Sequence, residues 1–188
     1  MLADRMKKRE TGFMLIILTI MCIGSGGCGN SSPKDPLQDP TAITTSSGEV
    51  IHYGGTRESV EEILGMEPTF WGYDEHYVQY TDETAAFYRE TDGEDCLAYI
   101  QIADSSYITY QGVRVGDQWE EVREKLNLDL VREELYTVDI LFDNGKQIDA
   151  NIDRDKWEED WLIIGYTYNI EGTITGIWVL DEKAAEFE

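Results

Sequence analysis

One pattern occurs twice in this chain and restricts the folds open to it. Ile51-His-Tyr-Gly-Gly55 resembles Ile108-Thr-Tyr-Gln-Gly112, 57 residues later. A short amphipathic segment follows each, with apolar residues four positions apart: Val60 and Leu64, then Val122 and Leu126. Residues at this spacing share one face of a helix, so the pattern predicts two short helices that each bury one side.

Strand-rich sequence follows each predicted helix. Cys96–Asp104 resembles Thr173–Asp181, which lies 77 residues later. We therefore expect an α+β fold of two tandem repeats, about 48–106 and 107–182, each a helix followed by antiparallel strands. The helices are expected to pack on one face of the sheet. The alternative is that two helix–strand units resemble one another by chance.

The N-terminal segment, residues 1–27, has the pattern of a signal peptide. Four basic residues precede the uncharged run 12–24, which is shorter than the roughly 20 residues that span a bilayer core. Small residues then lead to Cys28. This order resembles the lipobox of bacterial lipoproteins, and the resemblance implies a thioether lipid on Cys28, cleavage before it and acylation of the new N-terminus. An ordinary secretory peptide and an uncleaved anchor are the alternatives, and all three place the remaining chain outside the cytoplasm.

Residues 28–47 contain three of the four prolines and a Thr-Thr-Ser-Ser run. Such a composition buries little apolar surface, so a flexible tether is expected there and a single domain over 48–188. Removal of residues 1–27 and lipidation of Cys28 would leave Cys96 as the only thiol. The domain is then expected to depend on an apolar core without an intramolecular disulfide.

The formal charge of the whole chain is −23. The segment before Cys28 contributes four basic and two acidic residues, so the part after it is near −25. A surface of this charge repels nucleic acid and anionic lipid headgroups, and we expect no nucleic-acid partner. Cationic partners and divalent metals remain open, and a simple solvated acidic surface is the plainer interpretation.

Catalytic motifs are missing from the sequence. His52 and His76 are the two histidines, and neither lies in a motif with a Ser or Cys nucleophile. There is no Gly-x-Ser-x-Gly, phosphate loop, dinucleotide fingerprint or His-Glu-x-x-His sequence. We therefore expect no enzyme activity and no cofactor.

One segment resembles a degraded calcium loop of the EF-hand type. Its oxygen-bearing side chains stand at alternate positions, followed by an acid at the twelfth: Asp149, Asn151, Asp153, Asp155 and Asp160. Arg154 occupies the sixth position, where the tight turn needs glycine. Apolar residues alternate with the acids, which is also the pattern of a half-buried strand. Calcium and an ordinary strand are both retained as interpretations.

Aromatic side chains supply a second kind of candidate surface. Five of them form the candidate interface: Trp71, Tyr77, Tyr166, Tyr168 and Trp178. Aromatic residues dominate the energetics of many protein interfaces. A domain of this size also needs large core residues, so each of the five has burial in the core as its alternative.

The segments 55–65 and 112–122, together with the lipobox, resemble the superfamily of β-lactamase-inhibitor proteins and OmlA/BamE-type lipoproteins. The resemblance implies a domain that binds another protein and has no catalytic activity. We therefore expect a lipid-anchored protein-binding or scaffold domain on the extracytoplasmic side of the cell membrane. The alternative is a lipoprotein that binds an ion or small ligand, such as calcium or a carbohydrate. A surface hydrolase with paired carboxylates is a third possibility.

Overall fold

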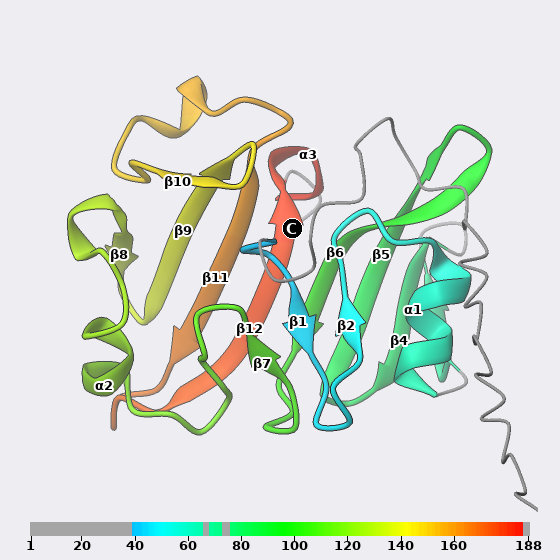
Figure 1. The fold of residues 1–188 in the computed structure, drawn as a ribbon, viewed down its shortest axis with the longest axis horizontal. Coiled ribbons are helices and arrows are strands. Elements are labelled where there is room, and N and C mark those ends of the chain that lie inside the picture. Colours follow the sequence, from blue (N-terminus) through cyan, green and yellow to red (C-terminus); the bar gives the residue numbers. More distant parts are fainter. Residues whose placement is uncertain (1–38, 66–67, 73–75, 186–188) are drawn as a thin grey trace, which may run out of the picture.

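The computed structural model describes residues 39–65, 68–72 and 76–185 of the chain. Within them the protein is mostly β, with one large antiparallel sheet and one small sheet (Figure 1). The α-helices are short: α1 (Arg57–Leu64), α2 (Trp119–Arg123) and α3 (Glu182–Ala185). The expected α+β fold, with helices as the layer on one face of the sheet, is therefore wrong.

The large sheet has the strand order β10-β9-β11-β12-β6-β5-β4-β3, and β8 pairs with β9 beside β10. Its strands are β3 (Phe70–Gly72), β4 (Tyr77–Thr81), β5 (Thr84–Thr91), β6 (Glu94–Ile102), β8 (Arg132–Glu134), β9 (Thr137–Asp143), β10 (Lys146–Ile148), β11 (Leu162–Tyr168) and β12 (Ile174–Asp181). Strands β3 to β6 form an N-terminal meander, and β8, β9, β11 and β12 form a C-terminal meander. The two meanders join where β6 pairs with β12.

A three-stranded sheet lies over one face of the large sheet, together with α1 and α2 (Figure 1). Its central strand β1 (Ile43–Thr44) pairs with β2 (Val50–Ile51) on one edge and with β7 (Ile108–Thr109) on the other. Strand β1 falls inside the segment expected to be a tether, and Ile43 is buried. The folded part of the chain therefore begins before residue 48.

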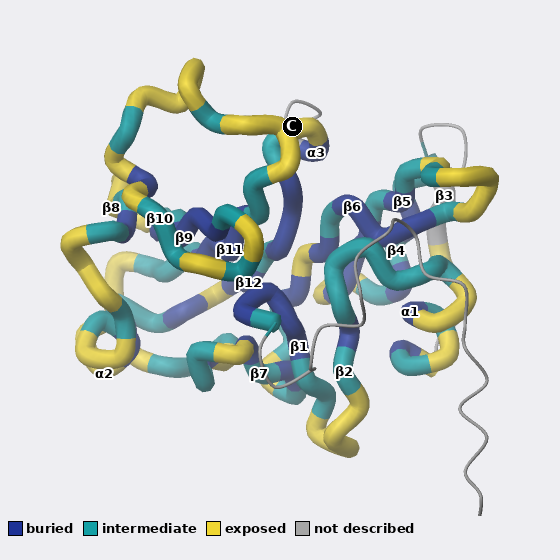
Figure 2. Tube along the Cα trace, turned by 45° about the horizontal axis from the view of Figure 1, so that its top comes forward, coloured by how far each residue is buried: buried dark blue, intermediate teal, exposed yellow. Residues whose placement is uncertain are grey.

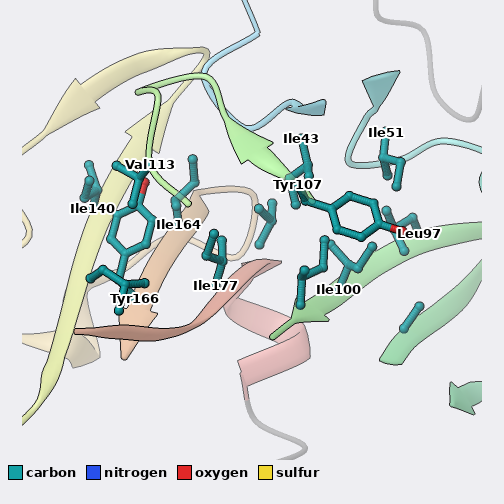
Figure 3. Packing of buried hydrophobic residues seen from close by; sticks show 14 of the residues in the cluster. Ile43, Ile51, Leu97, Ile100, Tyr107, Val113, Ile140, Ile164, Tyr166 and Ile177 are labelled. Atoms are coloured by element: carbon teal, nitrogen blue, oxygen red, sulfur yellow. The ribbon is translucent and has the colours of Figure 1, made fainter. Parts of the chain in front are cut away.

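The main core fills the space between these two layers. Ile43 and Ile51 from the small sheet lie over Leu97, Ile100 and strand residues of the C-terminal meander, as Figure 3 shows. Val60 and Leu64 of α1 and Val122 of α2 are buried in the same cluster. The apolar helix faces recognised in the sequence thus do bury, but as small parts of a layer made mainly of strands and loops.

The opposite face of the large sheet, called here the open face, has only a partial cover. Alternate residues of the same strands point to it, so Ile163 and Leu180 belong to a second apolar cluster while Ile164 and Val179 belong to the first. The cover consists of α3 and the segment 149–161, which joins β10 to β11 and is mostly exposed (Figure 2). Two 3₁₀ turns complete the description: η2 (Leu128–Leu130) and η3 (Arg154–Lys156).

Among the described residues, no helix has the length and apolar character needed to cross a membrane.

Candidate ligand-binding cleft

A cleft of about 400 Å³ lies on the open face, between the C-terminal meander and the segment 149–161. This volume falls within the range of small-molecule sites in proteins. Its lining combines three aromatic side chains with polar and aliphatic ones: Tyr99, Gln101, Glu134, Thr137, Asp139, Arg154, Trp157, Ile163, Thr167, Trp178 and Leu180.

The side chain of Trp178 covers the sheet at Gly165, its cross-strand partner on β11. A Cβ atom built on Gly165 would lie 1.8 to 2.2 Å from three atoms of the indole, so the ring rests directly on the glycine backbone. A glycine inside a strand commonly marks such a close approach. Because Gly165 has no side chain, the indole lies against the sheet and offers its outer surface to the cleft.

Polar groups flank the indole within the same row of cross-strand partners. Gln101 on β6 lies opposite Trp178, and Asp139 on β9 lies opposite Gly165. Tyr99 Oη donates a hydrogen bond to Gln101 Oε1 at 2.9 Å, which orients the amide at the edge of the cleft. The cleft therefore has an aromatic surface with hydrogen-bonding groups on two sides.

The overhanging side of the cleft is built around Trp157. The guanidinium carbons of Arg132 and Arg154 lie 5.8 and 5.5 Å from the centre of its ring, within the range of cation–π contact. Arg132 also donates to Glu134 Oε1 from Nε at 2.8 Å, and Arg154 Nε lies 3.4 Å from Glu182 Oε1. Both cations on this wall thus have acidic partners, so the wall offers little uncompensated positive charge.

The five candidate interface aromatics do not share one surface. Trp178 lines the cleft, and Tyr77 lies on β4 beside a smaller hollow of about 110 Å³. Tyr166 is fully buried in the main core, so it cannot contact a partner. Tyr168 stacks on Trp119 of α2 with ring centres 5.5 Å apart, on the covered side. The side chain of Trp71 lies outside the described residues.

The candidate calcium ligands are likewise not brought together. Among the described residues, no group of three or more His, Cys, Asp or Glu side chains is placed to hold a metal ion. Asp149 Oδ1 accepts a hydrogen bond from the backbone of Asn151, and Asp153 Oδ2 pairs with Lys156 Nζ at 2.5 Å. Arg132 and Arg154 border the hollow that Asn151, Asp153 and Asp155 line, and their charges oppose a bound cation. Asp160 does not line that hollow.

The proposed lipidation site Cys28 lies outside the described residues. Cys96 is buried and disulfide-bonded, and its partner also lies outside them. A sulfur atom in a disulfide cannot carry a thioether, and cleavage would remove Cys22. The disulfide and the lipidated, cleaved form are therefore alternative states of the chain, and this pairing differs from the expectation of a domain without a disulfide.

A buried ion pair near the end of β12 fixes the chain beside the cleft. Both guanidinium nitrogens of Arg89 donate to the Asp181 carboxylate, at 2.6 and 2.9 Å, and Tyr53 Oη donates to it at 2.5 Å. Burial alone would raise the pKa of Asp181, but these donors and the backbone N–H of Ala184 hold it below 3.8. The same carboxylate thus holds α3 and ties β5 of the N-terminal meander to β12 of the C-terminal one.

Sequence reasoning identified Trp178 but missed the residues that make a cleft of it. Gln101 and Asp139 come from strands far apart in the chain, and nothing in their local sequence sets them apart. Gly165 did carry a signal: it interrupts the run of large residues in Leu162–Tyr168, where a strand normally avoids glycine. Trp157 follows the candidate calcium segment and was not considered with the other aromatics.

Comparison with known proteins gives no relative for this chain: no family model, no curated protein and no solved structure matches it. The resemblance to the β-lactamase-inhibitor and OmlA/BamE-type superfamily therefore stays a prediction, and the function is argued below from the residues of the chain itself.

Proposed function

We propose that this protein is a lipid-anchored binding domain on the extracytoplasmic side of the cell membrane, and that the cleft on its open face is the ligand site. The observation that carries the proposal is the Trp178 indole lying on Gly165 within a cleft of about 400 Å³. Apolar pockets with a few convergent polar groups are the usual form of a binding site. The earlier preference for a flat protein interface gives way to this cleft.

The lining supports binding rather than catalysis. Among the described residues that line the cleft there is no histidine, cysteine or lysine. Of its two carboxylates, Glu134 accepts hydrogen bonds from Arg132, which favours its charged form and opposes service as a general acid. Nothing here pairs a nucleophile with a base. The domain therefore functions by holding a ligand, without chemistry.

The lipobox pattern supports the location. Residues 29–40 separate Cys28 from the buried Thr41, and a chain of that length reaches at most about 40 Å. The domain would then stay within about one domain diameter of the membrane surface. The acidic surface would keep it from lying flat on anionic lipids.

The anchor is tested by intact mass spectrometry of the native protein, measured without and with reductant. We expect a chain that starts at Cys28, carries acyl groups and has the same mass in both conditions. The Cys28→Ala variant should retain residues 1–27 and lose membrane attachment. A non-reducible linkage is the expected state; a reducible link between Cys96 and Cys28 would exclude the thioether and defeat the anchor.

Binding is tested by capture from native envelope fractions with the full-length protein and its Trp178→Ala variant. We expect the wild type to retain a ligand, protein or not, that the variant does not. Tyr110→Ala is the matched control, because Tyr110 is 55% exposed and does not line the cleft. Equal recovery with both variants would remove the cleft from the proposal.

A protein partner is the second candidate, and a specific feature favours it. Tyr77, Phe87 and Tyr99 are consecutive cross-strand partners on β4, β5 and β6, and all three are half-buried on the open face. They extend the aromatic surface of the cleft towards the N-terminal meander. A partner that spans both would lose affinity on Tyr77→Ala as well as on Trp178→Ala, whereas a ligand confined to the cleft would not respond to Tyr77→Ala.

A further inference from the structure

The cleft offers one large apolar surface and a surrounding set of hydrogen-bonding groups. Trp178 presents its indole, backed by Gly165, and Gln101 and Asp139 occupy the same row of cross-strand partners on either side. Neighbouring strands are about 4.8 Å apart, so the three spacings from β6 to β9 separate the amide and the carboxylate by about 14 Å. Thr137 and Thr167 add hydroxyl groups to the lining on the side of β9 and β11.

This arrangement has the chemistry of a sugar ring in reverse. A pyranose has an apolar face of C–H groups and a rim of hydroxyls that both donate and accept hydrogen bonds. An indole face contacts the C–H face with a large apolar area. Amide, carboxylate and hydroxyl groups around it accept and donate in the plane of the ring, and a polar ligand needs such partners when it leaves water.

Charge selects among the saccharides. The chain has a net charge of −23, and the cleft itself contains the carboxylates of Glu134 and Asp139. The nearby guanidinium groups of Arg132 and Arg154 are paired with Glu134 and Glu182. An anionic glycan would therefore meet repulsion without a free cation in the cleft to offset it.

We propose that the cleft binds an uncharged saccharide, with one ring stacked on Trp178 and its hydroxyl groups bonded to Gln101 and Asp139. The inference rests on the proposed function, since it names the ligand class of that same site. It differs from a protein interface because the recognition is confined to the cleft and needs the polar rim as much as the indole.

The test uses the full-length protein in detergent micelles and three neutral hexasaccharides as probes: cellohexaose, chitohexaose and maltohexaose. Calorimetry and tryptophan fluorescence measure binding, and hexagalacturonate is the anionic comparison. We expect at least one neutral probe to bind and the anionic one not to bind. Trp178→Ala should weaken the affinity by about tenfold or more, a factor that equals about 1.4 kcal/mol.

Two further variants make the result specific. Gln101→Ala removes a surface amide without touching the core and should also weaken binding, by about threefold to tenfold. Tyr110→Ala should bind as the wild type does. Thermal unfolding of each variant shows whether the fold is retained; if Trp178→Ala is unfolded, the Gln101→Ala result decides.

The outcomes separate this inference from the proposal on which it rests. If no neutral hexasaccharide binds, but a protein from the envelope is captured in a Trp178-dependent way, the cleft is a binding site and the saccharide is the wrong ligand class. If neither a saccharide nor an envelope component depends on Trp178, both fail. Preferential binding of hexagalacturonate would overturn the charge argument and with it the inference.

Discussion

The two meanders of the large sheet make the same contacts at corresponding places. A bridge joins the residue before each helix to the start of its last strand: Thr56 to Cys96, and Gln118 to Thr173. These two bridges differ by the sequence offsets of 62 and 77 residues. Such agreement shows that the path from helix to final strand is the same in both halves.

The irregularities correspond as well. Each meander has a register shift just before a tyrosine, at Phe87/Tyr88 in one and at Thr167/Tyr168 in the other. The first residue of each helix lies on that tyrosine. The Arg57 guanidinium is 5.3 Å from the Tyr88 ring centre, and the Trp119 ring stacks on Tyr168.

What separates the meanders is the connection between their middle strands. In the N-terminal meander β4 leads to β5 by a tight turn after Thr81. In the C-terminal meander β10, η3 and the rest of the segment 144–161 stand between β9 and β11, and part of this segment overhangs the cleft. The comparison teaches that a shared strand framework carries the core, while an addition to one half supplies the site.

The largest expected effect concerns the joint between the halves. Asp181→Ala removes the partner of Arg89 and Tyr53 and the cap of α3, and should lower the free energy of unfolding by about 3 kcal/mol. The corresponding residue of the N-terminal meander is Asp104, which accepts a local bond from the Ser106 backbone. Asp104→Ala should cost less than about 1 kcal/mol. Urea unfolding of both variants checks the difference; equal losses would show that the joint is not special.

The same carboxylate predicts a dependence on pH. Because the folded-state pKa of Asp181 is lowered below 3.8, its contribution to stability is present above about pH 4 and is lost as the pH falls through the folded value. Asp181→Ala should therefore lose less stability than the wild type between pH 4 and lower pH. Asp39, whose pKa is lowered beside His52 and Thr41, contributes the slope that remains in the variant. Identical acid slopes would contradict the assignment to Asp181.

The two corresponding tyrosines should respond differently to loss of the hydroxyl. Tyr88 Oη shares a buried hydrogen bond of 2.7 Å with Tyr80, whose pKa burial raises to about 12. Tyr88→Phe should cost about 1 kcal/mol. Tyr168 Oη donates to Glu133 at the surface, so Tyr168→Phe should stay within about 0.5 kcal/mol. Thermal unfolding measures both; a larger loss at Tyr168 would reverse the ranking of the two halves.

A smaller effect on stability is expected at the floor of the cleft. Ala85 in the N-terminal meander faces Gln101 as Gly165 faces Trp178 in the other. Gly165→Ala gains strand propensity but forces the indole outward, so stability should change by no more than about 1 kcal/mol. The Trp178 indole N–H resonance should shift strongly, while Ala85→Gly should leave it nearly in place. An unmoved resonance in Gly165→Ala would show that the indole does not rest on the glycine.

The smallest effect is predicted for calcium. The acids of the segment 149–160 do not converge and face two arginines, so millimolar calcium should shift the unfolding temperature by less than about 1 °C. Magnesium at the same concentration is the control for ionic strength. A saturable, calcium-specific stabilisation that Asp153→Asn removes would restore the metal site.

Much of the local organisation was accessible from the sequence. The spacing of Val60 and Leu64 gave a helix with both residues buried, and Val122 in the second predicted helix is buried as well. The choice of fold class failed because those helices are only eight and five residues long. The layer over the covered face consists mainly of β1, β2 and β7, three two-residue strands too short to show a period.

The sequence by itself determined which segments alternate, where the acidic charge lies and which pattern precedes Cys28. These properties are local, so they can be read from neighbouring residues. Only the tertiary structure decided that Tyr166 is core while Trp178 lines a cleft. Both stand in apolar strands of similar composition, and the faces of those strands differ only in what packs on them: the small sheet on one side, and a partial overhang on the other.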